Sequence, residues 1–254
     1  MKWLAVALNT FREAIRNHIL YNLLIFALLI IGGSTIIGNL TIGQGDKVIT
    51  DIGLASISIF GVLISIFVGI GLIYKEIDKK TIYNILSKPI RKSEFILGKY
   101  MGLLMTLGIN VLLMTSGLLI TLYYMSGAFA WHILPAILLI FFELMIVTSV
   151  ALLFSTFSTP TLSTIFTLAI YVIGHLTEDL VRLARNTESV LIKVITKSLY
   201  YALPNLENFN IKTQVVYNLS INPGYYLIVF SYGFLYLAFI VTITLFIFAR
   251  RNFN

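Results

Sequence analysis

Residues 19–38 read ILYNLLIFALLIIGGSTIIG and contain no charged side chain. A helix needs about 20 mostly apolar residues to cross the hydrocarbon layer of a membrane, which is about 30 Å thick. A strand of a membrane barrel needs only about ten residues and alternates apolar with polar side chains. Because this run is continuous and long, it predicts a membrane-spanning helix rather than a barrel strand.

Similar apolar runs recur along the chain. Of its 254 residues, 58% are hydrophobic and only 11% are charged, whereas an ordinary soluble domain has about 25% charged residues. The sequence therefore predicts an all-α, polytopic membrane protein with a single transmembrane domain over residues 1–254. Besides 19–38, we expect spans at 52–74, 100–124, 132–154, 160–176 and 225–248, which makes six transmembrane helices.

The sequence lacks the residues that disulfide bonds, metal binding and hydrolysis would require. The chain has no cysteine, so it has no disulfide framework and no thiolate metal site. Its histidines, His18, His132 and His175, lie near predicted membrane boundaries, where we expect them to be solvated rather than to bind a metal. Neither HExxH nor GxSxG occurs, which argues against a membrane-embedded hydrolase.

Two segments outside the spans are amphipathic. Residues 1–18 place apolar side chains at helical spacing beside Lys2, Arg12 and Arg16, so we expect an interfacial helix in the headgroup layer. Residues 177–222 form the long hydrophilic region, with an amphipathic helix expected from about 178 to 201. That helix either shields a pathway or contacts an extracytoplasmic partner, or it rests on the outer leaflet.

The distribution of Lys and Arg predicts the orientation. With six spans, both termini lie on one side, which also holds the connection 75–99 and twelve of the 18 Lys and Arg residues. Positive residues mark cytoplasmic loops, and this explains the net charge of +7 without nucleic acid. We therefore expect a multi-pass protein of the cell inner (cytoplasmic) membrane, with cytoplasmic termini and residues 177–222 outside.

The connection 75–99, KEIDKKTIYNILSKPIRKSEFILGK, has an order of its own. Pro89 should end a short helix, and Ser93 should cap the next helix with Glu94 in its first turn. The short helix carries an apolar patch of Ile82, Ile85 and Leu86. Apolar residues mixed with both signs of charge favour docking onto a protein over attraction to anionic lipid, although a helix lying in the headgroups stays an alternative.

This connection resembles the one between the second and third spans of ABC-2-type transporter permeases. That family shows an acid, a short Thr-containing helix, Leu-x-x-Pro, an Arg, and a Gly-Lys pair that opens the third span. The matching residues here are Glu76, Thr81, Leu86, Pro89, Arg91, Gly98 and Lys99. The organisation of nearly the whole chain also fits, and it is similar to the permeases that serve multicopper-enzyme maturation.

The resemblance implies a type V exporter-like permease. Two permease chains, as a homodimer or a heterodimer, would bind two cytoplasmic ABC ATPase subunits through the 75–99 coupling segment. This chain has no GxxxxGK[ST] phosphate loop, so ATP and Mg would belong to the partner and the chain itself would have no cofactor and not be an enzyme. The alternative is a mechanotransmission or assembly subunit that acts on an extracytoplasmic partner. The implied ATPase-coupling residues are Glu76, Thr81, Ile82, Ile85, Leu86, Lys88, Pro89, Arg91 and Lys92.

Two features inside the spans stand out. Glu143 is an acid well inside a span, where a charge costs about 2.5–3.5 kcal/mol. It either contacts substrate or a gate, or, as we favour, it bonds a polar residue such as Asn110. Gly61, Ser65 and Gly69 lie four apart, which favours close packing against another helix, although scattered glycines are tolerated in membrane helices.

Overall fold

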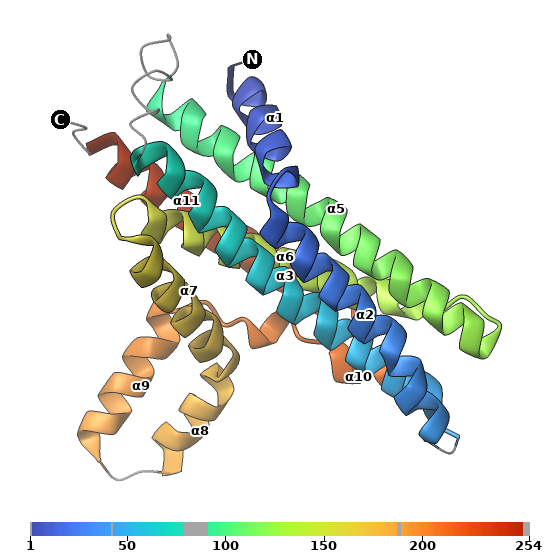
Figure 1. Ribbon diagram of the computed structural model, residues 1–254. Coiled ribbons are helices and arrows are strands. Elements are labelled where there is room, and N and C mark those ends of the chain that lie inside the picture. Colours follow the sequence, from blue (N-terminus) through green and yellow to red (C-terminus); the bar gives the residue numbers. More distant parts are fainter. Residues whose placement is uncertain (1, 42, 79–90, 187–188, 251–254) are drawn as a thin grey trace.

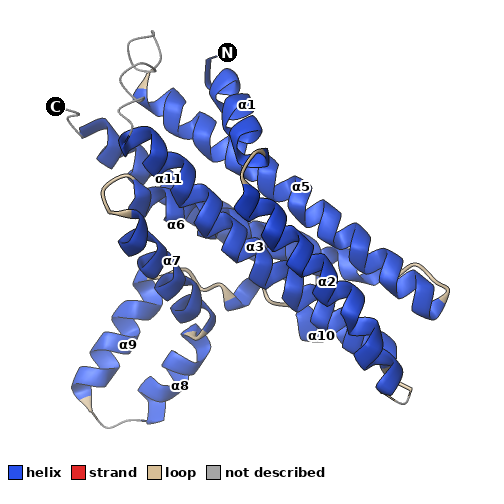
Figure 2. Cartoon of the chain, viewed as in Figure 1, coloured by secondary structure: helices blue, strands red, loops and turns tan. Residues whose placement is uncertain are grey.

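The computed structural model describes residues 2–41, 43–78, 91–186 and 189–250. Over these ranges the chain forms helices joined by short loops, without a strand (Figure 2). The helices are α1 (Lys2–Ile15), α2 (His18–Leu40), α3 (Gly45–Asp78), α5 (Lys92–Ser126), α6 (Leu134–Ser155), α7 (Pro160–His175), α8 (Thr177–Asn186), α9 (Val190–Ala202), α10 (Lys212–Val216) and α11 (Pro223–Arg250), with 3-10 turns η1 (Trp131–Ile133) and η2 (Glu207–Phe209).

Five helical stretches of the described chain are long and apolar enough to cross a membrane: α2, α3, α5, η1 with α6, and α11. The helix α7 has 16 residues, which at 1.5 Å per residue give only about 24 Å. It passes the same test when joined to the start of α8 across a 63° bend. The prediction of an all-α polytopic fold is therefore confirmed, with five spans, or six where the bent pair of α7 and α8 counts as one.

The helices α3 and α6 form the centre of the bundle. In their most apolar windows 67% of the residues are buried, against 22% in α2 and α11. A methyl group at Gly61 of α3 would come within 2.5 Å of Leu144 on α6. Ser65, one turn further along, is also buried. The small residues of α3 thus permit close helix contact, as predicted.

Both chain termini lie at one end of the bundle, where α5 begins (Figure 1). There the Lys92 Nζ donates a hydrogen bond to the Ala249 carbonyl oxygen at 3.1 Å. One turn further in, the rings of Phe95 and Phe248 stack with centroids 5.8 Å apart. We call this region, residues 2–16, 91–99 and 246–250, the basic end.

The opposite end of the bundle is crossed by residues 203–217, which we call the far-end cap. The Leu206 N–H donates to the Gly174 carbonyl oxygen at 3.0 Å, and the Tyr225 hydroxyl donates to the Asn208 carbonyl oxygen at 2.7 Å. Phe209 is fully buried, because Gly233 of α11 leaves room for its ring. The cap is therefore packed into the bundle rather than lying loosely over it.

The helices α8 and α9 form a hairpin that projects from the bundle (Figure 1). The single amphipathic helix predicted over 178–201 is thus wrong, since α8 ends at Asn186 and α9 begins at Val190. The predicted end of the helical pattern at about residue 201 agrees with the structure, because α9 ends at Ala202 and is followed by extended backbone at Leu203.

Candidate functional site

The connection predicted to couple to an ATPase is framed by the two longest helices. Six of its nine predicted residues lie outside the described part of the chain: Thr81, Ile82, Ile85, Leu86, Lys88 and Pro89. Glu76 lies in the last turns of α3. The helices α3 and α5 have 34 and 35 residues, which give about 50 Å each. Because the hydrocarbon layer is only about 30 Å thick, both helices extend beyond it.

The start of α5 is fixed by a side chain that reaches backwards. The Glu94 Oε2 accepts a hydrogen bond from the Arg91 N–H at 3.0 Å, and Arg91 is the extended residue before the helix. The prediction that Ser93 caps this helix is therefore wrong, since Ser93 already lies inside it. Arg91 is exposed, while Lys92 is bonded to the end of α11.

The Gly-Lys pair of the predicted motif binds α1 to α5. Added methyl groups at Gly98 and Gly102 would come within 2.7 Å of the Trp3 carbonyl oxygen and 2.5 Å of the Ala7 carbonyl oxygen, respectively. Between the two glycines, the Lys99 Nζ lies 3.7 Å from the Glu13 Oε2, although the Lys99 side chain is only 1% exposed. The α1 backbone thus lies directly on α5.

The fully buried residues of α1 are small. Ala7, Thr10 and Ala14 are fully buried, and the Thr10 hydroxyl donates to the Val6 carbonyl oxygen within α1. The larger Leu4 and Leu8 are 41% and 42% exposed. Those side chains remain available for lipid, so the predicted placement of α1 in the headgroup layer stays a prediction.

Glu143 of α6 faces His175, the last residue of α7. Glu143 is completely buried, and its Oε1 lies 3.5 Å from the His175 Nε2. The Nδ1 of His175 lies 3.1 Å from the Tyr171 carbonyl oxygen. Since a carbonyl oxygen can only accept, Nδ1 carries a hydrogen. The Nε2 of His175 and the Oε1 of Glu143 face each other at ion-pair distance without forming a hydrogen bond, which makes the two residues a polar pair inside the bundle.

This pair corrects two predictions. Asn110 is not the partner of Glu143, because its Nδ2 donates to the Thr106 carbonyl oxygen within α5 at 2.8 Å. His175 is not simply solvated at a membrane boundary, because its side chain is only 21% exposed and faces the acid. Glu143 therefore has a polar neighbour, as the structural interpretation expected, but this neighbour is His175 and not Asn110.

Two charged groups of the far-end cap act electrostatically on the Glu143–His175 pair. Lys212 acts electrostatically on both Glu143 and His175, and Glu207 acts on Glu143. Burial raises the pKa of the Glu207 carboxyl, and the Asn210 Nδ2, which donates to it at 3.0 Å, opposes that rise. No three His, Cys, Asp or Glu side chains gather into a metal site in the described ranges. The cap and the pair thus form one polar cluster.

Comparison with known families gives a match over nearly the full length. The model of the ABC-2 family transporter proteins matches residues 4–252. The chain belongs to this family. No curated protein matches it significantly. The ABC-2 resemblance is thereby confirmed, whereas the subgroup of multicopper-enzyme maturation stays a prediction. As an ABC-2 family member, this chain is a multi-pass membrane permease and not itself the catalytic subunit.

Two functional features of this ABC-2 permease escaped the sequence analysis. The close approach of α1 has a local signal, because Gly98 and Gly102 lie four apart on one face of α5. The electrostatic effect of Lys212 and Glu207 on Glu143 has no local signal in the sequence, because both residues belong to a segment that only the fold brings near Glu143.

Proposed function

We propose that this permease is a subunit of an ATP-driven exporter in the cytoplasmic membrane. Two permease chains would pair, and two cytoplasmic ATPase subunits would bind at the basic end through residues 75–99. Both chain termini would lie in the cytoplasm. The observation that carries this proposal is the packing of α1 and of the end of α11 against the start of α5, which is one of the two helices that frame the connection (Figure 1).

The contacts at the basic end supply a path for mechanical force. A push on residue 91 acts on the N-terminus of α5, which is a continuous helix of 35 residues. The pair Lys99–Glu13 joins α5 to α1, and the stacked rings of Phe95 and Phe248 join it to α11. These three helices would therefore move together, which is the kind of packed, rigid network that carries coupling between distant sites.

Reversal of charge at the connection tests the docking step. We expect Lys88→Glu with Arg91→Glu to lower the Mg-ATPase activity that co-purifies with a tagged permease about tenfold, because like charges would then face each other across the interface. Lys92 is left unchanged, since it holds the end of α11. The measurement is ATP hydrolysis per permease after purification from membranes.

The control reverses a charge on the projecting hairpin. Arg182→Glu on α8 should leave the co-purifying ATPase activity unchanged, because Arg182 is exposed and α8 lies on the hairpin, away from the basic end. Equal ATPase activity with the Lys88 and Arg91 variant and with wild type would contradict docking through this connection.

A second candidate function is mechanotransmission to an extracytoplasmic partner. The α8–α9 hairpin favours it, because the hairpin projects from the bundle (Figure 1) and exposes Leu191 and Val194. A thiol cross-linker at Leu191→Cys should then capture one discrete protein in an ATP-dependent manner. An exporter that acts without such a partner would give no ATP-dependent product.

A further inference from the structure

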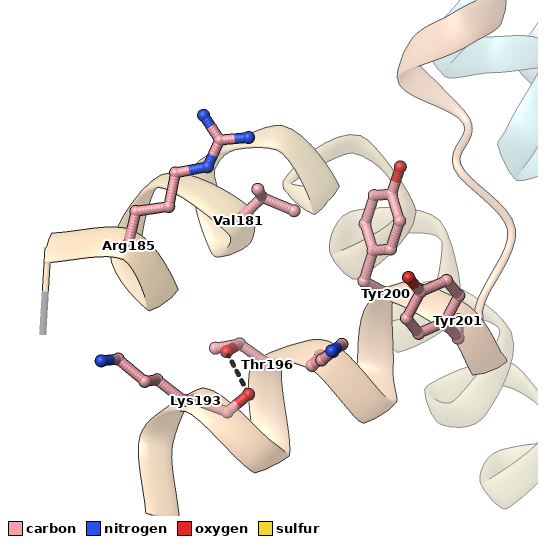
Figure 3. A pocket seen from close by; sticks show the side chains of 7 residues that line it. Val181, Arg185, Lys193, Thr196, Tyr200 and Tyr201 are labelled. Carbon is pink, nitrogen blue, oxygen red and sulfur yellow. Dashed lines mark hydrogen bonds between the residues drawn. The ribbon is translucent and has the colours of Figure 1, made fainter. Parts of the chain in front are cut away.

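A basic cleft of about 570 Å³ lies between α8 and α9. Arg185 comes from α8, whereas Lys193 and Lys197 come from α9, and Tyr200 and Tyr201 follow on the same helix. Figure 3 shows Arg185 and Lys193 on the two facing helices, with the tyrosines at the other end of the cleft. The cleft thus combines three cations with two phenolic hydroxyls.

The two carboxylates that the structure describes on the hairpin do not neutralise these cations. Glu178 and Asp179 lie 3.9 Å and 4.0 Å from Arg182, which does not line the cleft. Within the described ranges, Arg185, Lys193 and Lys197 form no ion pair with a carboxylate. Three exposed positive charges along one cleft give it a positive potential that attracts an anion. The cleft therefore has the charge of an anion site.

The surface around the cleft indicates where the anion comes from. On α9, Leu191, Val194 and Ile195 are 67%, 59% and 49% exposed, and Leu183 on α8 is 58% exposed. A helix with large apolar residues on one face and lysines on another is typical of one that lies in a membrane interface. Tyrosines are also enriched at that depth. An anion that reaches the cleft beside such a surface is most simply part of a lipid.

We propose that the α8–α9 cleft binds the phosphate head group of an anionic membrane lipid. Arg185, Lys193 and Lys197 contact the phosphate oxygens, and the hydroxyls of Tyr200 and Tyr201 donate to the remaining head-group oxygens. The Thr196 hydroxyl already donates to the Ile192 carbonyl oxygen within α9 at 2.7 Å, so we do not count it among the donors to the head group. This inference does not depend on the proposed transport function.

Binding of short-chain lipids to the purified full chain in uncharged detergent tests the proposal. We expect calorimetric titration to detect short-chain phosphatidylglycerol and to give at least tenfold weaker binding for phosphatidylcholine with the same acyl chains. Glycerol phosphate, which has the anion without the chains, should also bind at least tenfold more weakly. Equal affinity for the two lipids would overturn the anion site, and equal affinity for glycerol phosphate would overturn the lipid as its source.

Charge removal locates the site. The triple variant Arg185→Gln, Lys193→Gln, Lys197→Gln should weaken phosphatidylglycerol binding about tenfold to a hundredfold, because each near-surface cation contributes to attraction of an anionic lipid. Arg182→Gln, from the same hairpin, should change the affinity less than twofold. All four side chains are exposed, so the variants should fold, which circular dichroism checks. Unchanged affinity in the folded triple variant would overturn the proposal.

Discussion

Replacing Gly98 or Gly102 with leucine is expected to release α1 from α5 and to destabilise the permease by about 3 kcal/mol for each substitution. The added side chains would meet the α1 backbone at the carbonyl oxygens of Trp3 and Ala7. Main-chain atoms cannot move aside by changing a rotamer, so the whole of α1 must shift. That shift also separates the buried Lys99 from Glu13, which removes an ion pair between the two helices.

Thiol labelling measures the release of α1 directly, because the chain has no cysteine of its own. Ala7→Cys should react slowly with a maleimide, since Ala7 is fully buried against α5. In the Gly102→Leu background it should react at least tenfold faster. Leu8→Cys, at a position that is 42% exposed, should react rapidly in both backgrounds and serves as the reference for full access.

Leucine at another helical glycine provides the matched control. Gly32 of α2 has open space where a side chain would be added, so Gly32→Leu should leave both the stability and the Ala7→Cys labelling rate unchanged. Slow labelling of Ala7→Cys in the Gly102→Leu background would contradict the view that close backbone approach holds α1 in place.

The spans were predictable because lipid imposes a strong and local constraint. Residues 19–38 were expected to span, and α2 runs over His18–Leu40, since a continuous apolar run in a membrane has few alternatives to a helix. The central position of α3 also had a local signal in its small residues. For these features, the residues that carry the signal are the residues that form the structure.

The helix ends were less predictable, because hydropathy marks the membrane and not the helix. The third span was expected from residue 100, and the helix that contains it was expected to begin after a cap at Ser93, whereas α5 begins at Lys92. The Glu94 carboxylate accepts from the Arg91 N–H, so Arg91 takes the position before the helix. The capping residues thus indicated a helix start outside the apolar run, and only the identity of the cap residue was missed.

The partner of Glu143 was not predictable from the sequence. The pair requires α7 to end at the depth of Glu143, and α7 ends there because the chain bends by 63° into α8. Gly174 precedes the bend and leaves room for the far-end cap, since a methyl group there would lie 2.8 Å from the Pro204 carbonyl oxygen. The position of His175 therefore depends on the contact between Gly174 and the far-end cap, which is distant in the sequence.

The Glu143–His175 pair leads to an asymmetric expectation. His175→Phe should destabilise the permease by about 3 kcal/mol, because the acid is completely buried and would lose the polar group that faces it. Glu143→Gln should cost less than about 1 kcal/mol. With Nδ1 of His175 donating to the Tyr171 carbonyl oxygen, Nε2 can accept a hydrogen bond from the new amide.

A double-mutant cycle in thermal unfolding separates this pair from simple packing. Glu143→Met combined with His175→Phe should be more stable than His175→Phe alone by about 2 kcal/mol, since the apolar pair leaves no buried acid behind. If the double variant is as unstable as the single one, the two side chains do not interact, and Lys212 of the far-end cap becomes the better candidate for stabilising Glu143.

The same variants distinguish a structural from a functional role. We expect Glu143→Gln to fold normally and to retain ATP hydrolysis by the purified complex within about twofold, because the amide keeps the contact with His175 and changes little else. A loss of ATP hydrolysis at unchanged stability would contradict this expectation. It would mean that the capacity of the Glu143 carboxyl to take up and release a proton, which an amide lacks, takes part in the cycle of the permease, and that the bend between α7 and α8, where His175 faces the acid, is where it acts.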